Sequence, residues 1–422
     1  MNVLKKSWLE SLRKKQNLEL MIILIISFAS HLVLSSLYHG PVDFLIHYDA
    51  AKQISEGKVL YLTVTAHQTA EGVTFPYPDY PPVYLYMMGM IFALTGSSIF
   101  VMKAVLCFFN IACALMLYII CNGLRMTHRQ ALLAVAVFSF HPASFTMTVV
   151  GYFDYLPVLF LLLMVYFLHV RNPTKQNNRD HQLNALMSGI AVGLGTMTKL
   201  FPALALVIVL PWLLVQKRIK EALIFLLAAT SIVFLISLPF LLLIPEEFIY
   251  HVFSHVNAIR PNLSVYYYLF PFLYNTAVLL IIQAIFILFI GFIVATATSY
   301  NVRIEKIIPS CYFLLIGGFL FLNRINYPHY AAWFIPFIVL LMVESWGKNK
   351  LRLIILVSLQ AVSSFGGLLW SISWVNDPTY AESIPVLELS GFLLFNLCLL
   401  ILLLEEAHHL KKLLVSERAK YQ

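Results

Sequence analysis

Long apolar runs separated by short polar segments make up almost the whole chain. Each run approaches the ~20 apolar residues that a membrane-spanning helix needs. No polar segment is long enough for a soluble domain with its own core. The pattern predicts an all-α polytopic membrane protein, a single transmembrane domain over residues 1–422 with about 12 transmembrane helices, in a range of 11 to 13. The expected spans are 20–38, 99–121, 130–149, 153–169, 184–198, 200–216, 221–244, 268–296, 306–322, 329–346, 351–371 and 384–404.

The polar segments define the rest of the organisation. We expect a cytoplasmic amphipathic segment at 1–19, a first outer loop at 39–98, a second long outer loop at 245–267 and a cytoplasmic tail at 405–422. Inside the first outer loop, the apolar piece 83–94 is too short to cross the bilayer, so we expect interfacial helices there. A cleaved signal peptide is the alternative for the first run, but the later loops need that run as a span.

The charges support this topology. Only 11% of the residues are charged, against 60% that are hydrophobic. With a cytoplasmic N terminus, all but six of the 28 lysines and arginines fall in cytoplasmic segments, as the positive-inside rule requires. Counting 83–94 as a span would reverse every later loop and remove this bias. The net charge of +8 is therefore a topological signal and not a nucleic-acid footprint, and the outer six are Lys52, Lys58, Lys103, Lys199, Arg260 and Arg324.

Three outer acids are candidates for chemistry. Asp43 follows the first span, and a helix over 42–56 would place it on one face with His47 but not with Asp49. An acid beside a membrane cavity can act as a general base. The alternatives are a helix N-cap for Asp43 and a solvated loop acid for Asp49. Asp154 opens an apolar run, where an acid caps its helix, pairs with a cation or belongs to a site.

Aromatic and proline residues predict the wall of an outer cavity. Tyr80, Pro81 and Pro82 precede the 83–94 helix, and proline suits the first turn of a helix because its φ is fixed. They form a stiff turn, and we interpret them as a cavity wall as well. Tyr330 is the other wall candidate, although its neighbours Tyr327 and Trp333 are also typical of an interfacial aromatic belt.

Outer cations point to an anion. Lys199 is almost the whole turn between two spans, where it either extends to the lipid headgroups or binds a phosphate. Arg260 and Arg324 are candidate phosphate ligands, and His329 either hydrogen-bonds a phosphate or shuttles a proton. No nucleotide-binding motif is present, and no metal motif accompanies the histidines. We therefore expect no cofactor and no metal, and a sugar donor on this face would be lipid-linked.

These segments, taken in order, resemble the GT-C superfamily of integral-membrane glycosyltransferases, and most closely its polyprenyl-phosphate-mannose-dependent mannosyltransferases. The resemblance extends from residue 43 to residue 336. It is carried by Asp43-Phe44, Tyr48-Asp49-Ala50-Ala51, Gly57-Lys58-Val59-Leu60-Tyr61, Tyr80-Pro81-Pro82, Gly151-Tyr152-Phe153-Asp154, Thr198-Lys199-Leu200-Phe201-Pro202 and Tyr327-Pro328-His329-Tyr330 with Trp333 and Pro336.

The resemblance implies a catalytic acid in the first outer loop, which corresponds to Asp43, with Asp49 and Asp154 as candidate second acids. It implies inverting transfer of one sugar, mannose favoured, from a polyprenyl-phosphate donor to a lipid-linked or glycan acceptor. The expected cation clamp on the leaving phosphate is Arg324 and His329 with Lys199 or Arg260. The setting would be the cytoplasmic membrane of a prokaryote, with cytoplasmic termini and an extracytoplasmic active site.

Two other classes remain open. A polymerase or ligase of lipid-linked glycans would depend on outer arginines and a histidine without an acid base. A transporter or flippase of lipid-linked sugars would show internal repeats and a polar path through the membrane, and the predicted spans carry almost no charges. The sequence does not identify the sugar, the acceptor or the linkage.

Overall fold

The computed structural model describes residues 2–38, 42–64, 67–68, 74–75, 80–171, 178–257, 277–300, 302–323, 326–376 and 386–419. For 2–14, 42–43, 67–68, 74–75, 254–257, 368–376 and 386–388 the description covers the backbone only. Within these ranges the protein is almost entirely helical, as the sequence predicts. The two strands are β1 (His67–Gln68) and β2 (Thr74–Phe75), an antiparallel pair with His67 opposite Phe75.

The helices follow the apolar pattern closely. In the first half they are α1 (Asn2–Ser36), α2 (Val42–Ser55), α3 (Val83–Thr95), α4 (Ile99–Gly123), α5 (His128–Ser139), α6 (Pro142–Val150), α7 (Tyr155–Val165), the π-helix η1 (Tyr166–Val170) and α8 (Asn178–Thr196). In the second half they are η2 (Phe201–Ala205), α9 (Leu206–Val215), α10 (Ile219–Leu243), α11 (Pro245–Asn257), α14 (Ala277–Ser299), η4 (Ile304–Lys306), α15 (Ile308–Phe321), η5 (Pro328–Trp333), α16 (Ile335–Ser345), α17 (Lys350–Asn376) and α18 (Val386–Arg418).

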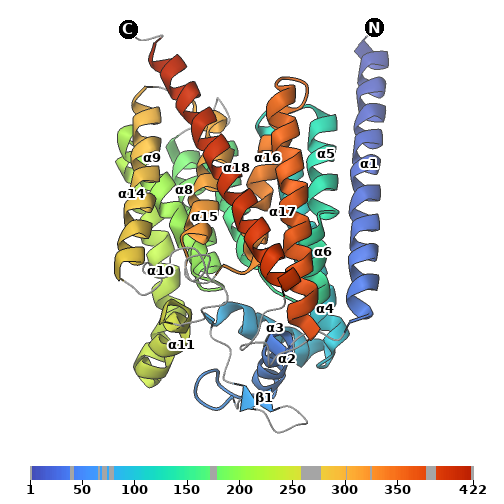
Figure 1. The fold of residues 1–422 in the computed structure, drawn as a ribbon, viewed down its shortest axis with the longest axis vertical. Helices are drawn as coiled ribbons and strands as arrows, with labels where there is room; N and C mark the ends of the chain where they lie inside the picture. The colour runs from blue at the N-terminus through green and yellow to red at the C-terminus, as the bar shows by residue number, and fades with distance from the viewer. Residues whose placement is uncertain are drawn as a thin grey trace.

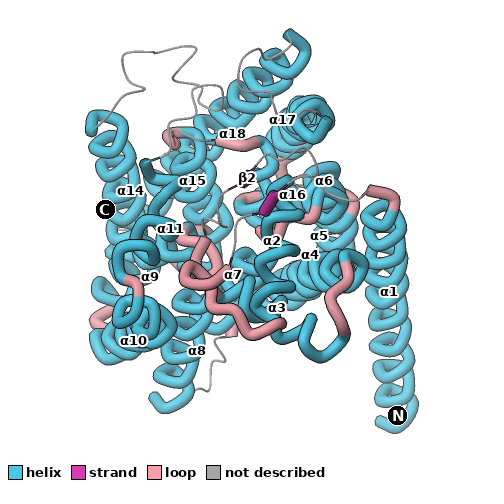
Figure 2. Tube along the Cα trace, turned by 90° about the horizontal axis from the view of Figure 1, so that it is seen from below, coloured by secondary structure: helices cyan, strands magenta, loops and turns pink. Residues whose placement is uncertain are grey.

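The long helices form a bundle with two different ends (Figure 1). Helix α1 begins and α18 ends at one end, which we call the terminal end. Helices α2, α3 and α11 lie at the opposite end, which we call the outer-loop end, across the ends of the longer helices (Figure 2). This arrangement separates the first outer loop from the two termini by the length of the bundle.

The described residues contain six helices that are long and apolar enough to cross a membrane, or seven if the bent pair α5 and α6 is one span. Shorter apolar helices, such as α3 and α16, account for much of the rest. The pair α5 and α6 bends by 46° where Pro142 occupies the first turn of α6. The number of about 12 spans stays a prediction.

Burial distinguishes the centre of the bundle from its lipid-facing surface. Helix α16 is buried along nearly all of its length, between α5, α15 and α17. In contrast, α10 and α14 expose large apolar side chains such as Leu235 and Phe292, at 61% and 66%. Apolar side chains exposed in this way are expected where a helix faces lipid.

Candidate active site

An ion pair between Asp154 and Lys199 is the charged centre of the outer-loop end. The Nζ of Lys199 donates a hydrogen bond to Oδ1 of Asp154 over 2.7 Å, and the two residues are only 6% and 1% exposed. Charges this deeply buried are costly unless they are paired. The pair joins the turn before α7 to the turn after α8, so it ties together two segments 45 residues apart.

This geometry decides between the alternatives that the sequence left open for these two residues. Asp154 directly precedes α7 but makes no side-chain capping hydrogen bond, so of the open alternatives the structure shows the cation pair and not the helix cap. Lys199 is buried against Asp154, which does not agree with the alternative that it extends to the lipid headgroups. Whether Lys199 binds a phosphate is a separate question that this contact leaves open.

Aromatic rings enclose the ion pair. The Lys199 Nζ lies 4.6 Å from the ring centre of Tyr330, 4.9 Å from that of Tyr80 and 5.1 Å from that of Trp333. Aromatic faces attract cations, so the rings stabilise the buried ammonium in addition to shielding it from water. The Trp333 indole N–H also donates to Oδ1 of Asp154. The predicted wall residues Tyr80 and Tyr330 are thus brought together around a charge.

The enclosed pair keeps Asp154 ionised. The positive charge of Lys199 and the hydrogen bonds from Lys199 and Trp333 all favour the ionised carboxylate. A carboxylate stabilised in this way is a weak proton acceptor. This property favours an electrostatic role for Asp154 over that of a general base.

His329 lies beside the pair in a stack of aromatic rings. Its imidazole is 4.3 Å from the ring centre of Tyr152 and 4.8 Å from that of Tyr327. The side chain is 6% exposed, and burial favours the neutral form of an imidazole. A neutral imidazole is suited to donate a hydrogen bond rather than to carry a charge.

The turn that carries Asp154 is fitted against helix α2. Helix α6 ends at Gly151, which has a φ of 95°, a conformation that favours glycine. A Cβ at this position would meet the Phe44 ring at 2.3 Å. Glycine is therefore favoured at position 151 for two reasons: the positive φ of its backbone and the lack of space for a Cβ beside Phe44. Phe44 immediately follows Asp43 in α2.

Lys103 of α4 contacts the ends of α1 and α6 and the Phe44 ring of α2. It is 1% exposed, and its ammonium donates to the carbonyls of Ser35 at 2.8 Å and Val149 at 3.2 Å, and also to that of Tyr38. The same ammonium lies 5.3 Å from the ring centre of Phe44. Carbonyls at the end of α1 are thus satisfied by a lysine from α4, and Phe44 in α2 lies against both Gly151 and Lys103.

From the sequence, Lys103 was assigned no function and was only placed outside the cytoplasmic segments. A signal was present, because a lysine inside an apolar run is expensive unless it finds several acceptors. The sequence could not identify those acceptors, because they are backbone carbonyls from two helices that are distant in the chain.

Helix α2 packs against the aromatic rings that surround the ion pair. His47 is 4% exposed, and its ring packs edge-on against Phe153 at 5.2 Å and Tyr80 at 5.4 Å. Asp43 occupies the position one turn earlier on this helix; its side chain lies outside the description. The helix begins at Val42, one residue before Asp43, and Asp49 is partly buried further along.

An apolar groove adjoins the site. Its volume is about 540 Å³, and α3 and α10 line it with residues that include Pro82, Tyr86, Met90 and Phe240. Pro82 lies two residues after Tyr80, and the backbone N–H of Val83 donates to the carbonyl of Met197 at 3.1 Å, close to Lys199. The apolar groove therefore lies beside the enclosed charges.

The structure thus gathers five predicted site residues at one place: Asp154, Lys199, His329, Tyr80 and Tyr330. Pro81 and Pro82 are buried nearby. Two predicted phosphate ligands, Arg260 and Arg324, lie outside the described residues, so their roles stay predictions. Trp333, which we expected in an aromatic belt and among the residues of the resemblance, is a direct partner of Asp154.

Comparison with known proteins identifies the fold. Residues 79–242 match a family described as dolichyl-phosphate-mannose-protein mannosyltransferase. The crystal structure of ArnT from Cupriavidus metallidurans, solved with bound undecaprenyl phosphate, superposes with a TM-score of 0.51 over 94% of this chain and 77% of that one, at 14% sequence identity. The chain has the GT-C fold. The resemblance inferred from the ordered motifs is confirmed at this level.

Two curated relatives carry the name undecaprenyl phosphate-alpha-4-amino-4-deoxy-L-arabinose arabinosyl transferase. The one from Pectobacterium atrosepticum is 30% identical over 193 residues, which cover 43% of this chain and 34% of that protein. The one from Enterobacter sp. is 38% identical over 99 residues, covering 21% of this chain and 18% of the relative. The chain spans about a third or less of the length of the curated relatives it matches.

Proposed function

We propose that this protein is a membrane glycosyltransferase that uses a polyprenyl-phosphate-linked sugar donor. The observation that carries the proposal is the position of a polar, charge-bearing centre directly beside an apolar groove. An amphiphilic donor needs both features, because its phosphate must meet cations while its isoprenoid chain stays in an apolar environment. The matched family and the names of the relatives support the same class.

In the proposed reaction, the isoprenoid chain enters the groove between α3 and α10, and the sugar phosphate reaches the enclosure around Lys199. Asp43 accepts the proton of an acceptor hydroxyl as its oxygen attacks the anomeric carbon. The bond between that carbon and the phosphate oxygen breaks, and the polyprenyl phosphate leaves with the electron pair. Attack from the face opposite the phosphate inverts the anomeric configuration.

The described residues support distinct roles in this reaction. Lys199 places a preorganised positive charge beside the position proposed for the leaving phosphate. Neutral His329 donates a hydrogen bond to it. Asp154 holds Lys199 in place and stays ionised, whereas Asp43 is the base. Arg260 and Arg324 remain proposed as additional phosphate ligands.

The sugar is a finer question. The description of the matched family contains mannose, which agrees with our expectation from the sequence. The relatives are named for an amino-deoxy-arabinose. We retain mannose as the proposed sugar and a lipid-linked or glycan acceptor on the extracytoplasmic face of a prokaryotic membrane.

The direct test is transfer from radiolabelled polyprenyl-phosphate sugars to a membrane extract. The donors are the mannose and the 4-amino-4-deoxy-arabinose derivatives, each tried with purified wild type, Asp43→Asn and Asp49→Asn. Asp49→Asn is the matched control, since it removes the same charge from another face of the same helix. We expect Asp43→Asn to lose about 10²- to 10⁴-fold in rate, the usual contribution of a general base, and Asp49→Asn to retain most of it.

The outcomes separate the alternatives. Full activity in Asp43→Asn would exclude the proposed base and favour a polymerase or ligase that works through cations. No transfer from either donor by wild type, together with movement of labelled lipid across proteoliposomes, would favour the flippase. Transfer of the amino sugar alone would replace mannose but keep the enzyme class.

A further inference from the structure

A second cavity lies at the terminal end, far from the candidate active site. Its volume is about 690 Å³. Three connections between helices meet around it: the turn from α4 to α5, the segment from α14 to α15 and the turn from α16 to α17, with α18 closing one side. Each connection contributes a cation to the lining, namely Arg125, Arg303 and Lys348.

These three cations are available to a ligand. All three side chains are exposed, and among the residues that the structure describes none of them has a recorded ion pair. Two other basic residues of the lining are already engaged. Lys306 pairs with Glu417 at 3.8 Å, and Arg352 belongs to a network of its own.

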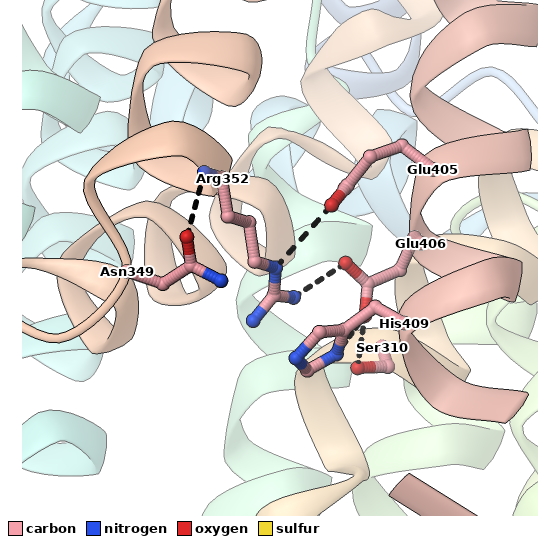
Figure 3. A network of polar contacts seen from close by, with 6 residues as sticks. All are labelled: Ser310, Asn349, Arg352, Glu405, Glu406 and His409. Carbon is pink, nitrogen blue, oxygen red and sulfur yellow. Dashed lines mark hydrogen bonds and ion pairs between the residues drawn. The ribbon is translucent and has the colours of Figure 1, made fainter. Parts of the chain in front are cut away.

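That network engages two acids of α18, Glu405 and Glu406 (Figure 3). Arg352 donates to Glu406 at 2.6 Å and lies 3.7 Å from Glu405, and Ser310 donates to Glu406 at 2.5 Å. Arg352 and Glu406 are 7% and 0% exposed. Two carboxylates are thus committed to one guanidinium. Glu305 and Glu344 also line the cavity, so its charge is mixed and suits a small anionic group better than a large polyanion.

Two buried polar groups in the lining have no partner. Ser345 is 3% exposed and His169 is 1% exposed, and neither Oγ of Ser345 nor Nδ1 of His169 has a hydrogen bond within the described structure. Buried polar groups nearly always have a partner. Their presence in the wall of a cavity with three free cations indicates that something polar occupies it.

We propose that this cavity is a binding site for a phosphate group, held by Arg125, Arg303 and Lys348 with Ser345 as a deeper hydrogen-bond donor. Guanidinium and ammonium groups are the side chains that bind phosphate oxygens most strongly. Basic pockets between transmembrane helices are suited to phospholipid headgroups, and a soluble phosphate ester offers the same chemistry. The site is independent of the proposed transfer reaction.

The test is binding to the purified full-length protein, measured by native mass spectrometry and by thermal shift in detergent. The probes are phosphatidylglycerol, diacylglycerol with the same acyl chains, glycerol 3-phosphate and inorganic phosphate. The site variant is Arg303→Gln with Lys348→Gln. The matched control is Lys220→Gln with Lys411→Gln, which removes two exposed cations from the same end outside this cavity.

We expect phosphatidylglycerol or glycerol 3-phosphate to bind wild type and the control alike, diacylglycerol to bind neither, and the site variant to lose about tenfold or more in affinity. Binding of phosphatidylglycerol alone identifies a lipid headgroup, and displacement by glycerol 3-phosphate identifies a soluble ester. Equal losses in the site variant and the control would overturn the proposal, since they would reveal general charge attraction. So would binding of no phosphate-bearing probe, or equal binding of diacylglycerol.

Discussion

The two ends of the bundle use one chemical device for different purposes. Each contains a buried ion pair that joins distant segments: Lys199 with Asp154 at the outer-loop end and Arg352 with Glu406 at the terminal end. Aromatic ring faces surround Lys199, whereas a second carboxylate lies near Arg352. Ring faces shield the ammonium without neutralising its charge, while a second carboxylate adds to the neutralisation of the guanidinium.

This difference teaches that the surroundings of a buried cation decide how much of its charge is neutralised. Lys199 has one carboxylate partner in an enclosure of ring faces, beside a groove. Arg352 has two acids within 3.7 Å and the side chain of Asn349 on its backbone N–H. We infer that the first pair serves chemistry and the second holds α15, α17 and α18 together.

Removing the cation of each buried ion pair is the strongest test of the difference between the two ends. Lys199→Met and Arg352→Met each leave a carboxylate buried without its cation, which costs about 3–5 kcal/mol. We expect both variants to unfold earlier in thermal denaturation in detergent. At a temperature where both remain folded, only Lys199→Met should lose sugar transfer. Loss of transfer in both variants would contradict the inference that only the Asp154–Lys199 pair serves the transfer reaction.

Neutralising both partners sharpens the same contrast. The double variants Asp154→Asn with Lys199→Met and Arg352→Met with Glu406→Gln remove the unpaired charge, so each should recover at least ~1–3 kcal/mol of the stability lost by its single variant. Thermal denaturation of the complete double-mutant cycles measures this coupling. Transfer should persist in the terminal-end double variant and stay absent in the Asp154 and Lys199 double variant. Recovery of transfer in the Asp154 and Lys199 double variant would assign that pair a purely structural role.

Two glycines with positive φ provide a smaller, closely matched test. Gly151→Ala adds a Cβ that meets Phe44 at 2.3 Å, whereas a Cβ at Gly347, which has a φ of 77°, meets nothing within 4 Å. The backbone cost is about 1 kcal/mol in each, and the clash adds about 1–3 kcal/mol to Gly151→Ala alone. Chemical denaturation and transfer rates should both be affected more at Gly151. Equal effects at the two glycines would mean that Phe44 yields without cost.

Lys103→Met tests the support of the first outer loop. It removes the donors to the carbonyls of Ser35 and Val149 but leaves the candidate site intact. We expect the rate of transfer to fall by about tenfold because Phe44 of α2 loses its contact with Lys103. Misplacement of a catalytic group by about 1 Å can cost up to ~100-fold. The control is Lys52→Met, an exposed lysine of α2. A fall in stability with unchanged transfer by the folded fraction would contradict a positioning role.

The sequence alone determined the class of the protein and the residues to watch. Runs of apolar residues dictate helices because backbone polar groups must be satisfied within the membrane, and the helices at 42–55 and 83–95 were expected from the same pattern. Lys199, Asp154 and His329 were recognisable because charged and titratable groups are costly near the hydrocarbon region and need a reason to be there.

Only the tertiary structure decided what those residues touch. The pairing of Asp154 with Lys199, the ring faces around the ammonium, and the carbonyls that Lys103 satisfies join segments tens of residues apart, and helical periodicity gives no information about such contacts. The same applies to the terminal end, where three connections that look like ordinary basic loops converge on one cavity. Sequence spacing specifies neighbours along a helix, whereas the partner of a buried charge depends on how the helices pack.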